Sequence, residues 1–450
     1  MSHLLLDAWR RTLRQHGDAP ALTDASTGTV ATFRELDGRA RAWLESNGPA
    51  GDALRARAVV FSLPNGAAWL DVFLGLMYAG ATAVALDAAE PEGAQRALAA
   101  ELRAAFRWDG TGLRALPGRA RRFADPQICL IKLTSGSTGR ARPLVFTDAQ
   151  MLADGRQVSE TMGITAQDLN YALIPFGHSY GLGNLTIPLL ARGVPIVVGS
   201  SPLPQAVATE FARWRPTVLP GVPAVFRGLA LSDVDPASLA SLRLAISAGA
   251  PLLPEVAAAF RARFGRPIHG FYGSSETGGI SYDRTGDATL AGRSVGCALR
   301  GVRLMVLRGE RLRVCSAAVF TQANRQRLEG RGCWIPADRA VVGARGEVTL
   351  LGRRGTMVKI AGRRIDLAEI TARLRRIPGV GEAWVSAAPG PEPVLGAAIA
   401  TDLTIEVVKA ALRADTAPWK TPKRWALVRE LPLTKRGKID TRALQDMVFG

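Results

Sequence analysis

The sequence predicts an α/β protein built around largely parallel sheets, followed by a smaller α+β unit. Two observations lead to this prediction. Short apolar runs that end at Gly, Pro or Asn alternate with amphipathic stretches of helical period through most of the first 350 residues. The chain of 450 residues also exceeds the size that one hydrophobic core usually supports, so two or more domains are expected.

The expected strands of the larger part are short and separated by helical patterns, as in parallel sheets whose connections are helices. They are residues 58–62, 128–133, 170–174, 195–198 and 242–247. Residues 72–86 form a long, strongly apolar run without a charge. With 15 residues this run is shorter than a membrane span, and it predicts a buried helix followed by a buried strand. No transmembrane segment is therefore expected.

A domain boundary is predicted at residues 353–355, between a first domain of residues 1–352 and a second of residues 356–450. After this boundary the apolar and helical patterns restart on a smaller scale. Strands are expected at residues 357–360, 382–387 and 395–400, and helices at residues 366–376, capped by Asp366, and 405–414. The remaining sequence, rich in Pro and Lys, is expected to form loops.

The net charge of +18 raises the question of an acidic partner. The arginines are scattered and no Lys/Arg tract is interleaved with aromatic residues, so nucleic acid is not expected as that partner. Residues 353–450 hold 18 Lys and Arg against 10 Asp and Glu, a net charge of +8. This excess suits a phosphate-bearing cofactor or an acidic carrier protein.

The cysteines argue against a structural metal site. Cys129, Cys297, Cys315 and Cys333 are far apart, no C-x-x-C pair occurs, and the chain has four histidines. They are predicted to be reduced, buried residues of a cytoplasmic protein. The first apolar run is too short for a signal peptide.

A segment rich in small and hydroxylic residues follows directly after the apolar run 128–133. Residues 134–143 read Thr-Ser-Gly-Ser-Thr-Gly-Arg-Ala-Arg-Pro. Two glycines let the backbone turn tightly and bring N–H groups close to a bulky anion. Hydroxyls can donate to phosphate oxygens, and Arg140 and Arg142 supply permanent positive charge. On these residues alone, a flexible Gly/Ser loop is an equal alternative.

This segment is not a Walker A loop, because Gly-x4-Gly-Lys-Ser/Thr is absent. It resembles the phosphate loop of the adenylate-forming superfamily, which comprises acyl-CoA synthetases, aryl-acid ligases and peptide-synthetase adenylation domains. The family pattern ends in Pro-Lys-Gly where this chain has Ala141, Arg142 and Pro143, so the cation is kept as arginine. The resemblance assigns the ATP phosphates to Thr134, Ser135, Gly136, Ser137, Thr138, Gly139 and Arg142.

Further segments resemble the nucleotide-binding motifs of this superfamily. Residues 271–277, Phe-Tyr-Gly-Ser-Ser-Glu-Thr, resemble its Tyr-Gly-x-Thr-Glu motif. An aromatic face suits adenine, and a carboxylate is a hard oxygen ligand for the Mg²⁺ that accompanies ATP. The resemblance implies that Glu276, together with Thr138, holds Mg²⁺. It implies nucleotide contacts for Gly249, Ala250, Pro251, Tyr272, Gly273 and Ser275.

The ribose of the nucleotide is expected to meet a separate segment. Residues 334–339, Trp-Ile-Pro-Ala-Asp-Arg, resemble a motif in which an aspartate accepts both ribose hydroxyls, which would be Asp338 here. Ala337 stands where the family usually has glycine. Each of these segments is also compatible with an ordinary strand and turn. Their order along the chain is what favours the family.

A histidine motif bears on the substrate. Residues 175–183, Pro-Phe-Gly-His-Ser-Tyr-Gly-Leu-Gly, resemble the Pro-x-x-His-x-x-Gly motif of acyl- and aryl-CoA ligases. The resemblance places His178 beside the reacting carboxylate, and Gly181 and Gly273 beside the acyl group. Peptide-type adenylation domains have an aspartate here that pairs with an ammonium group. Its absence favours an acid without an α-amino group.

Two segments near the carboxyl end complete the resemblance. Residues 352–364 resemble the hinge segment, with Arg353 and Lys359 at the nucleotide, Gly355 as the hinge and Gly362 in the thiol tunnel. Glycine at a hinge permits a large change of φ and ψ. Residues 431–438, Leu-Pro-Leu-Thr-Lys-Arg-Gly-Lys, resemble the terminal Pro-x-Thr-x-x-Gly-Lys motif, which makes Lys438 the expected catalytic residue.

The resemblance implies a fold and an activity. The fold is a large domain in αβαβα layers, followed by a small, mobile α+β domain. The activity is ATP- and Mg²⁺-dependent conversion of a carboxylic acid to acyl-AMP, with transfer to the thiol of CoA or of a carrier protein's phosphopantetheine. Two alternatives stay open. One is a nucleotide-binding homologue impaired in catalysis, and the other is a domain that activates amino acids.

Overall fold

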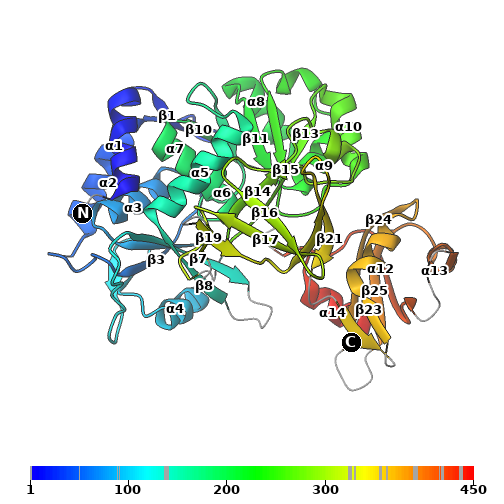
Figure 1. Cartoon of the computed structure of the whole chain (residues 1–450). Coiled ribbons are helices and arrows are strands. Elements are labelled where there is room, and N and C mark those ends of the chain that lie inside the picture. The colour runs from blue at the N-terminus through cyan, green and yellow to red at the C-terminus, as the bar shows by residue number, and fades with distance from the viewer. Residues whose placement is uncertain are drawn as a thin grey trace. The chain divides into compact units, whose positions relative to one another are not determined.

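The computed structural model of the chain confirms the α/β class, with large parallel-rich sheets and a small sheet unit (Figure 1). It describes residues 3–49, 51–88, 90, 92–135, 141–322, 327–328, 331–353, 357–360, 363–388, 394–414, 416, 420–434 and 439–450. Within the described ranges, no helix combines the length and hydropathy needed to cross a membrane.

The chain divides into two compact units. The first consists of Met1–Met305, Arg313–Ile335 and Val342–Val348, and the second of Val306–Leu312, Pro336–Val341 and Thr349–Gly450. The chain therefore passes between the units several times near residues 305–349. The hinge expected at residues 353–355 stays a prediction.

The larger sheet of the first unit has nine strands, and its centre is parallel. Strands β1, β10, β9, β11, β12 and β13 run parallel, whereas β2, β14 and β15 are antiparallel at the two edges. In sheet order the strands are β15 (Cys297–Ala298), β14 (Gly278–Tyr282), β13 (Ile268–Ser274), β12 (Leu244–Ser247), β11 (Val218–Gly221), β9 (Asn170–Ala172), β10 (Ile196–Val198), β1 (Pro20–Asp24) and β2 (Val30–Thr32).

A second sheet of six strands has a parallel centre formed by β5, β3, β4 and β7. The antiparallel strands β6 and β8 form its edges. In sheet order the strands are β6 (Leu113–Ala115), β5 (Phe106–Trp108), β3 (Ala58–Ser62), β4 (Thr82–Leu86), β7 (Ile128–Ser135) and β8 (Ala141–Thr147).

Three hydrophobic cores show that these sheets and their helices form five layers. Successive strand residues point to opposite faces. On β3, Ala58 and Val60 enter a core shared with α4, whereas Val59 and Phe61 enter a central core. On β10, Ile196 enters the same central core, and its neighbour Val197 enters a third core with α8, α9 and α10. The predicted αβαβα layering is thereby confirmed.

The helices of the first unit are placed by these cores. The central layer holds α1 (Leu4–His16), α2 (Phe33–Asn47), α3 (Ala67–Tyr78), α5 (Asp148–Met162) and α7 (Ile187–Arg192), and the outer layers hold α4 (Glu92–Glu101) on one side and α8 (Pro204–Trp214), α9 (Pro223–Leu231) and α10 (Pro254–Phe264) on the other. Shorter helical segments are α6 (Ser179–Gly181), η1 (Leu182–Thr186), η2 (Pro236–Leu239) and α11 (Asp287–Leu290).

An ion pair ties the starts of β9 and β12 together. The Arg243 guanidinium donates to both carboxylate oxygens of Asp168, at 2.6 and 2.7 Å. The Thr217 hydroxyl and the Thr165 N–H also donate to this carboxylate, each at 2.9 Å. Burial raises the pKa of Asp168, but the hydrogen bonds from Arg243, Thr165 and Thr217 outweigh it and hold the pKa below its usual range.

This carboxylate gives a prediction about acid stability. A carboxylate whose pKa is lower in the folded state stabilises the fold above its unfolded pKa and loses that contribution as pH falls through the folded pKa. We expect Asp168→Asn to lower the free energy of unfolding by about 1–3 kcal/mol at pH 7. The difference from wild type should shrink below about pH 4, where the unfolded carboxyl takes up its proton.

Urea unfolding of both proteins at pH 7 and at pH 3 measures this difference. The exposed, charge-matched variant Asp233→Asn is the control. A gap between wild type and Asp168→Asn that is equally large at the two pH values would contradict the electrostatic origin.

Strands near residues 303–353 form a separate sheet, and the division between the two units runs through it. Its order is β18 (Arg327–Leu328), β19 (Arg331–Trp334), β17 (Arg311–Ser316), β20 (Asp338–Val342) and β21 (Val348–Arg353), with β16 (Arg303–Leu307) also paired to β17.

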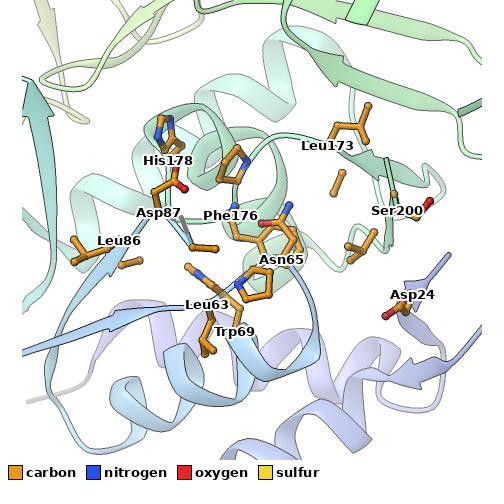
Figure 2. A pocket seen from close by; sticks show the side chains of 18 of the residues that line it. Asp24, Leu63, Asn65, Trp69, Leu86, Asp87, Leu173, Phe176, His178 and Ser200 are labelled. Atoms are coloured by element: carbon orange, nitrogen blue, oxygen red, sulfur yellow. Dashed lines mark hydrogen bonds between the residues drawn. The ribbon is translucent and has the colours of Figure 1, made fainter. Parts of the chain in front are cut away.

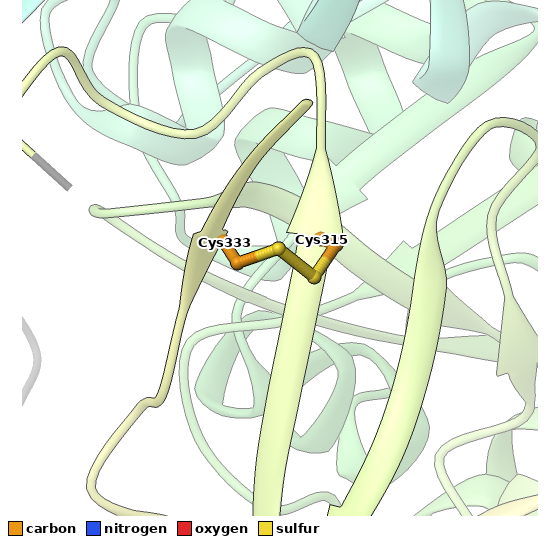
Figure 3. The surroundings of a disulfide bond; sticks show 2 residues. All are labelled: Cys315 and Cys333. Atoms are coloured by element: carbon orange, nitrogen blue, oxygen red, sulfur yellow. A yellow bond between two sulfur atoms is a disulfide. The ribbon is translucent and has the colours of Figure 1, made fainter. Parts of the chain in front are cut away.

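A disulfide in this sheet corrects the prediction that all four cysteines are reduced. Cys315 in β17 lies opposite Cys333 in β19, and their sulfur atoms are bonded at 2.06 Å (Figure 3). The prediction was wrong because it judged the cysteines by their separation in sequence, whereas antiparallel strand pairing brings them face to face. Cys129 and Cys297 are free thiols.

The second unit contains a three-stranded sheet with a parallel pair, β25 and β26. Its strands are β24 (Val380–Ala387), β25 (Leu395–Thr401) and β26 (Arg424–Val428); the hairpin is β22 (Met357–Ile360) with β23 (Arg363–Asp366), and the helices are α12 (Leu367–Arg375), α13 (Ile405–Ala414) and α14 (Thr441–Phe449). One face of the sheet packs with α12 and α13, and the other packs with α14.

The loop expected after residue 414 is a second correction. This part of the chain contains β26 and α14. Asp440 accepts hydrogen bonds from the N–H groups of Arg442 and Ala443 and so caps α14. Leu444 and Val448, four positions apart, are buried against the sheet. The abundance of Pro and Lys concealed this short amphipathic pattern.

Candidate functional site

The predicted phosphate segment joins two paired strands. β7 and β8 pair antiparallel from Ile128 opposite Thr147 to Ser135 opposite Ala141. Pro143 lies opposite Leu133 within this ladder. Because β8 is an edge strand, a proline that lacks an N–H is tolerated there. Residues 136–140, which include four of the predicted phosphate contacts, lie outside the described residues, as do the side chains of Thr134 and Ser135.

Arg142, the cation predicted to bind phosphate, places its guanidinium near two aromatic rings. Its guanidinium lies 5.2 Å from the centroid of the Trp334 ring and 5.8 Å from that of Phe320. The two rings meet edge to face at 5.0 Å. Arginine is attracted electrostatically to aromatic faces, so this corner fixes the direction of the side chain. The corner lies beside the disulfide, because Cys333 precedes Trp334.

Phe320 also contacts the backbone of Glu276, the predicted magnesium ligand. The Phe320 N–H donates to the Glu276 carbonyl at 3.0 Å. One residue further, the Thr321 N–H donates to the Val145 carbonyl of β8 at 2.8 Å, and the Val145 N–H donates to the Gln322 side chain at 3.0 Å. The segment 320–322 therefore joins the β7–β8 hairpin to the turn that carries Glu276. Its role could not be predicted, because no motif marks these residues.

Buried ionisable groups support the strand that follows Glu276. Asp154 of α5 accepts a hydrogen bond from the Gly279 N–H of β14 at 3.0 Å. Lys132 of β7 is also buried, with its Nζ 4.2 Å from the centroid of the Phe146 ring and without a hydrogen-bond partner among the described residues. Burial raises the pKa of Asp154 and lowers the pKa of Lys132, against their mutual attraction.

The predicted base-binding residues follow β12 at its carboxyl end. Ser247 of β12 lies opposite Gly270 of β13, so residues 249–251 and Tyr272 share the carboxyl edge of the sheet. Gly249 has φ +88°, a left-handed conformation that favours glycine. The Ser247 hydroxyl is buried and has no partner among the described residues. An unpaired donor at this edge fits a polar ligand such as a nucleotide.

The histidine motif is folded back on itself at the same edge. The side chain of Asn65, just after β3, donates to the Ile174 carbonyl at 2.9 Å and accepts from the Phe176 N–H at 2.7 Å. The Tyr180 hydroxyl donates to the Ile246 carbonyl of β12 at 2.9 Å. His178 and Gly181 are thus held between the two sheets. A π-helical turn, η1, follows them, a feature frequent at functional sites.

Asn65 is a positioning residue to which the sequence analysis assigned no role. We expect Asn65→Ala to lower the free energy of unfolding by about 1–3 kcal/mol, because it leaves two backbone groups unpaired. We also expect a lower kcat/KM for the acid, because the histidine turn loses its brace. Urea unfolding and steady-state kinetics measure the two effects.

Asn47→Ala is the matched control for this prediction. Asn47 donates one hydrogen bond, to the Trp43 carbonyl at the end of α2. We expect it to leave kcat/KM unchanged. If Asn65→Ala reduced stability no more than this control, the bracing role would be wrong.

A pocket of about 380 Å³ opens beside the histidine motif (Figure 2). It is lined by the chain segments that follow β1, β3, β4, β9 and β10 at their carboxyl ends, and it includes His178. Among the described residues, Gly249, Ala250, Pro251 and Tyr272, which are expected at the base, do not line it, and neither does Glu276. The pocket is therefore distinct from these described residues, whereas the predicted contacts at residues 136–139 lie outside the described residues.

The remaining predicted residues lie in the second unit, and some of them are outside the residues that the structure describes. Asp338 begins β20, Arg353 ends β21 and Lys359 is in β22, with the last two described by backbone only. Lys438, Gly355 and Gly362 lie outside the described residues. The structure thus connects Arg142 to Glu276 through Phe320, and it places His178 and Tyr272 near the carboxyl ends of strands β9 and β13. The contacts of Lys438 stay a prediction.

The residues fit magnesium bound together with a nucleotide better than a protein-only metal cage. Among the described residues, no three His, Cys, Asp or Glu side chains are grouped as metal ligands. Mg²⁺ in phosphate-transfer sites usually takes one or two carboxylates, with phosphates and water completing its shell. The single carboxylate of Glu276 beside the phosphate hairpin fits that donor set.

Comparison with known families agrees with this arrangement. Residues 105–319 match the family model of the AMP-binding enzymes, and residues 369–438 match the model of the AMP-binding enzyme C-terminal domain. The first match spans the phosphate hairpin, the histidine motif and Glu276. The second ends at Lys438.

Individual relatives are acyl- and aryl-CoA ligases. A salicylyl-CoA synthase / salicylate adenylyltransferase of a Streptomyces species is 28% identical over 386 residues, which is 76% of this chain and 69% of the relative. A sulfoacetate–CoA ligase of Cupriavidus necator is 29% identical over 362 residues, 74% of this chain and 70% of the relative. The ATP-bound structure of MatB from Rhodopseudomonas palustris matches with a TM-score of 0.82 and 22% identity, over 99% of both chains.

Proposed function

Because the chain belongs to the adenylate-forming superfamily, we propose that it activates a carboxylic acid with ATP and passes the acyl group to a thiol. A carboxylate oxygen attacks the α-phosphorus, giving acyl-AMP and pyrophosphate. The thiol then attacks the acyl carbon and AMP leaves. The observation that carries this proposal is the corner at Phe320, which contacts the Arg142 guanidinium and binds the Glu276 backbone.

The residues have separate roles in this proposal. Arg142 and the hydroxyls of the 134–139 segment hold the β- and γ-phosphates, and Glu276 holds Mg²⁺, which neutralises phosphate charge. Asp338 binds the ribose, and Lys438 stabilises the negative charge that develops between carboxylate and α-phosphate. Positioning and electrostatics supply most of the catalysis in such transfers.

Thiol transfer requires a change at the same centre. We infer that the second domain turns about residues 353–355, withdraws Lys438 and brings Gly362 to the thiol's path. Conformational steps of this kind commonly separate two half-reactions. CoA and an acidic carrier protein both remain candidates as the acceptor, and the net charge of +8 on residues 353–450 suits either.

The acid is proposed to lack an α-amino group. The histidine motif offers no carboxylate for an ammonium group, since its described residues 175–183 contain no Asp or Glu. The alternative of a homologue impaired in catalysis rests on Ala141, Pro143 and Gly355, where the chain departs from the family pattern. The position of Pro143 argues against impairment. Pro143 lies in the edge strand β8, and no further strand pairs with the outer side of β8, so an N–H from residue 143 is not needed there.

ATP–pyrophosphate exchange tests the proposal. The protein is supplied with pooled aryl, cinnamoyl-type, fatty and amino acids, and we expect exchange with one of the non-amino-acid pools. Comparing free CoA with a holo carrier protein then identifies the acceptor. Intact ATP binding without exchange in any pool would favour the impaired homologue. Exchange only with amino acids would contradict the substrate class.

A further inference from the structure

The disulfide between Cys315 and Cys333 holds together two strands whose pairing is short (Figure 3). Strands β17 and β19 pair over three residue pairs, and the two cysteines form the central pair. On its other side, β19 pairs with the two-residue strand β18. Pairings this short are marginally stable by themselves. The covalent bond therefore fixes β19 against β17.

The strand that this bond fixes carries Trp334, the residue after Cys333. The Trp334 ring meets the Phe320 ring edge to face, with their centroids 5.0 Å apart. The guanidinium of Arg142 lies 5.2 Å from the centroid of the Trp334 ring. A shift of β19 therefore moves an aromatic ring against which the predicted phosphate cation is placed.

The segment that follows Cys315 contacts the other half of the predicted ATP site. Phe320 is buried in the central core, and its N–H donates to the Glu276 carbonyl at 3.0 Å. The next N–H, of Thr321, donates to the Val145 carbonyl of the phosphate hairpin at 2.8 Å. Because the cysteines are 18 positions apart, the disulfide closes a loop that contains both contacts. One covalent bond thus holds in place the neighbours of the phosphate cation and of the predicted magnesium ligand.

We propose that the Cys315–Cys333 disulfide controls nucleotide binding, so that the oxidised protein binds Mg-ATP more tightly than the reduced protein. The inference rests on the proposed function, which places ATP beside Arg142 and Glu276. In the reduced protein, β19 can separate from β17, and the rings of Trp334 and Phe320 lose their fixed positions. Binding of ATP then has to order these groups, and the cost of ordering lowers the affinity.

Reduction of this bond is a two-electron exchange with a dithiol. One thiolate of the dithiol attacks a cysteine sulfur, and the S–S bond breaks with its electron pair leaving on the other cysteine. The second thiolate of the dithiol then displaces the attached cysteine. Two protons pass to Cys315 and Cys333, and the dithiol becomes a cyclic disulfide. Both cysteines are buried, so the exchange requires local opening of β19.

Nucleotide binding in the two redox states tests the proposal. The full chain is kept oxidised or treated with dithiothreitol, and its thiols are counted after denaturation. We expect two thiols, Cys129 and Cys297, in the oxidised protein and four in the reduced protein. Calorimetry should then show Mg-ATP binding about ten-fold weaker after reduction, the effect of one charge-assisted contact, with recovery on reoxidation. Equal affinity in the two states, or four thiols in the oxidised protein, would overturn the proposal.

Linkage provides a second measurement, which needs no knowledge of the acid. If the disulfide form binds Mg-ATP about ten-fold more tightly, saturating Mg-ATP must shift the thiol–disulfide equilibrium toward the disulfide by the same factor. Thiol counts at equilibrium with mixtures of reduced and oxidised dithiothreitol measure this shift. Adenosine, which lacks the phosphates, should leave the equilibrium unchanged. An equilibrium that Mg-ATP does not move would contradict the coupling.

Variants separate this coupling from a general loss of stability. Replacing both cysteines, Cys315→Ala with Cys333→Ala, removes the bond. With the acid found by exchange, we expect the KM for ATP to rise about ten-fold and the KM for the acid to stay close to wild type. Cys297→Ala, which removes a free thiol, is the matched control and should change neither KM. A double variant with a lower free energy of unfolding but an unchanged KM for ATP would show a bond that only stabilises the fold.

Trp334→Leu tests the route of the coupling. In the oxidised protein this variant should weaken Mg-ATP binding about as much as reduction does. Reduction of the variant should then add little, because the contact through which it acts is already lost. Full additivity of the two effects would overturn the route through Trp334. Failure of every form to bind Mg-ATP would overturn the proposed function, whereas tight binding that ignores the redox state would overturn this inference alone.

Discussion

Replacing Lys438 with alanine is expected to slow acyl-adenylate formation by about 10²–10³-fold or more, the usual effect of removing one preorganised electrostatic donor. Negative charge builds up between the carboxylate and the α-phosphate in the transition state, and an ammonium group placed there stabilises it. ATP–pyrophosphate exchange measures this half-reaction. Because the effect belongs to the transition state, the KM for the acid should change much less than kcat.

Lys435→Ala is the matched control, since it removes the same charge three residues earlier in the same segment. The second half-reaction gives another check. Transfer from chemically prepared acyl-AMP to a thiol should proceed in Lys438→Ala at a rate close to wild type, because the proposed role ends with adenylation. Unchanged adenylation in Lys438→Ala would sink the assignment.

Gly181→Ala is expected to disrupt the histidine turn. A Cβ at position 181 would lie 1.9 Å from the Pro175 carbonyl oxygen and 2.8 Å from its carbon, and both atoms belong to the backbone. Relief requires that the turn open, which moves His178. We expect a loss of about 3 kcal/mol in the free energy of unfolding, typical of a severe overpacking. Displacing a positioning element by about 1 Å is expected to reduce kcat/KM by about 10²-fold.

Gly38→Ala separates this clash from a general sensitivity to alanine. Gly38 is exposed within α2, and nothing lies within 4 Å of its would-be Cβ. Alanine there should stabilise the protein by about 0.5–1 kcal/mol. Urea unfolding and steady-state kinetics on the two variants give the comparison. A Gly181→Ala protein with wild-type stability and kcat/KM would show that the turn does not need its close approach.

The elements that the sequence predicted well are those with one dominant local signal. Residues 58–62 became β3 with unchanged bounds, because an uninterrupted apolar run stops at a turn containing proline. The helix at residues 405–414 also kept its bounds, since its apolar residues recur at helical spacing. The layering followed from the alternation of such elements together with the family resemblance.

The errors arose where long-range pairing or a weak pattern decided the structure. The bond between Cys315 and Cys333 depends on the register of β17 and β19, which no local pattern reveals. Strand β26 became visible only through its pairing with β25. Helix α14 is short, and its signal, Asp440 before a pair of apolar residues at spacing four, was hidden by the basic segment before it.

In the candidate site, too, features with a local sequence signal were predicted, and features that depend on long-range contacts were not. Motifs predicted Arg142, Glu276 and His178 as site residues, because the chemistry of phosphate, magnesium and carboxylate demands particular residue types at fixed spacing. They did not identify what positions these residues. The hydrogen bonds of Asn65 and the contact of Phe320 with Glu276 join segments far apart in the chain, and no sequence pattern shows which segments meet.

The pairing of β1 with β10 has a consequence for how the chain acquires its structure. Leu22 lies opposite Ile196, and the whole six-stranded sheet is encoded between these two strands. Closing so long a loop costs conformational entropy before the contacts between the strands compensate for it, and this makes folding slow. During synthesis, β1 therefore lacks its partner β10 until residues 196–198 have been made. Until then β1 exposes an unpaired strand edge with which other chains can associate. Fragments that stop short of residue 196 should aggregate, and chaperones should hold the nascent chain until that strand arrives.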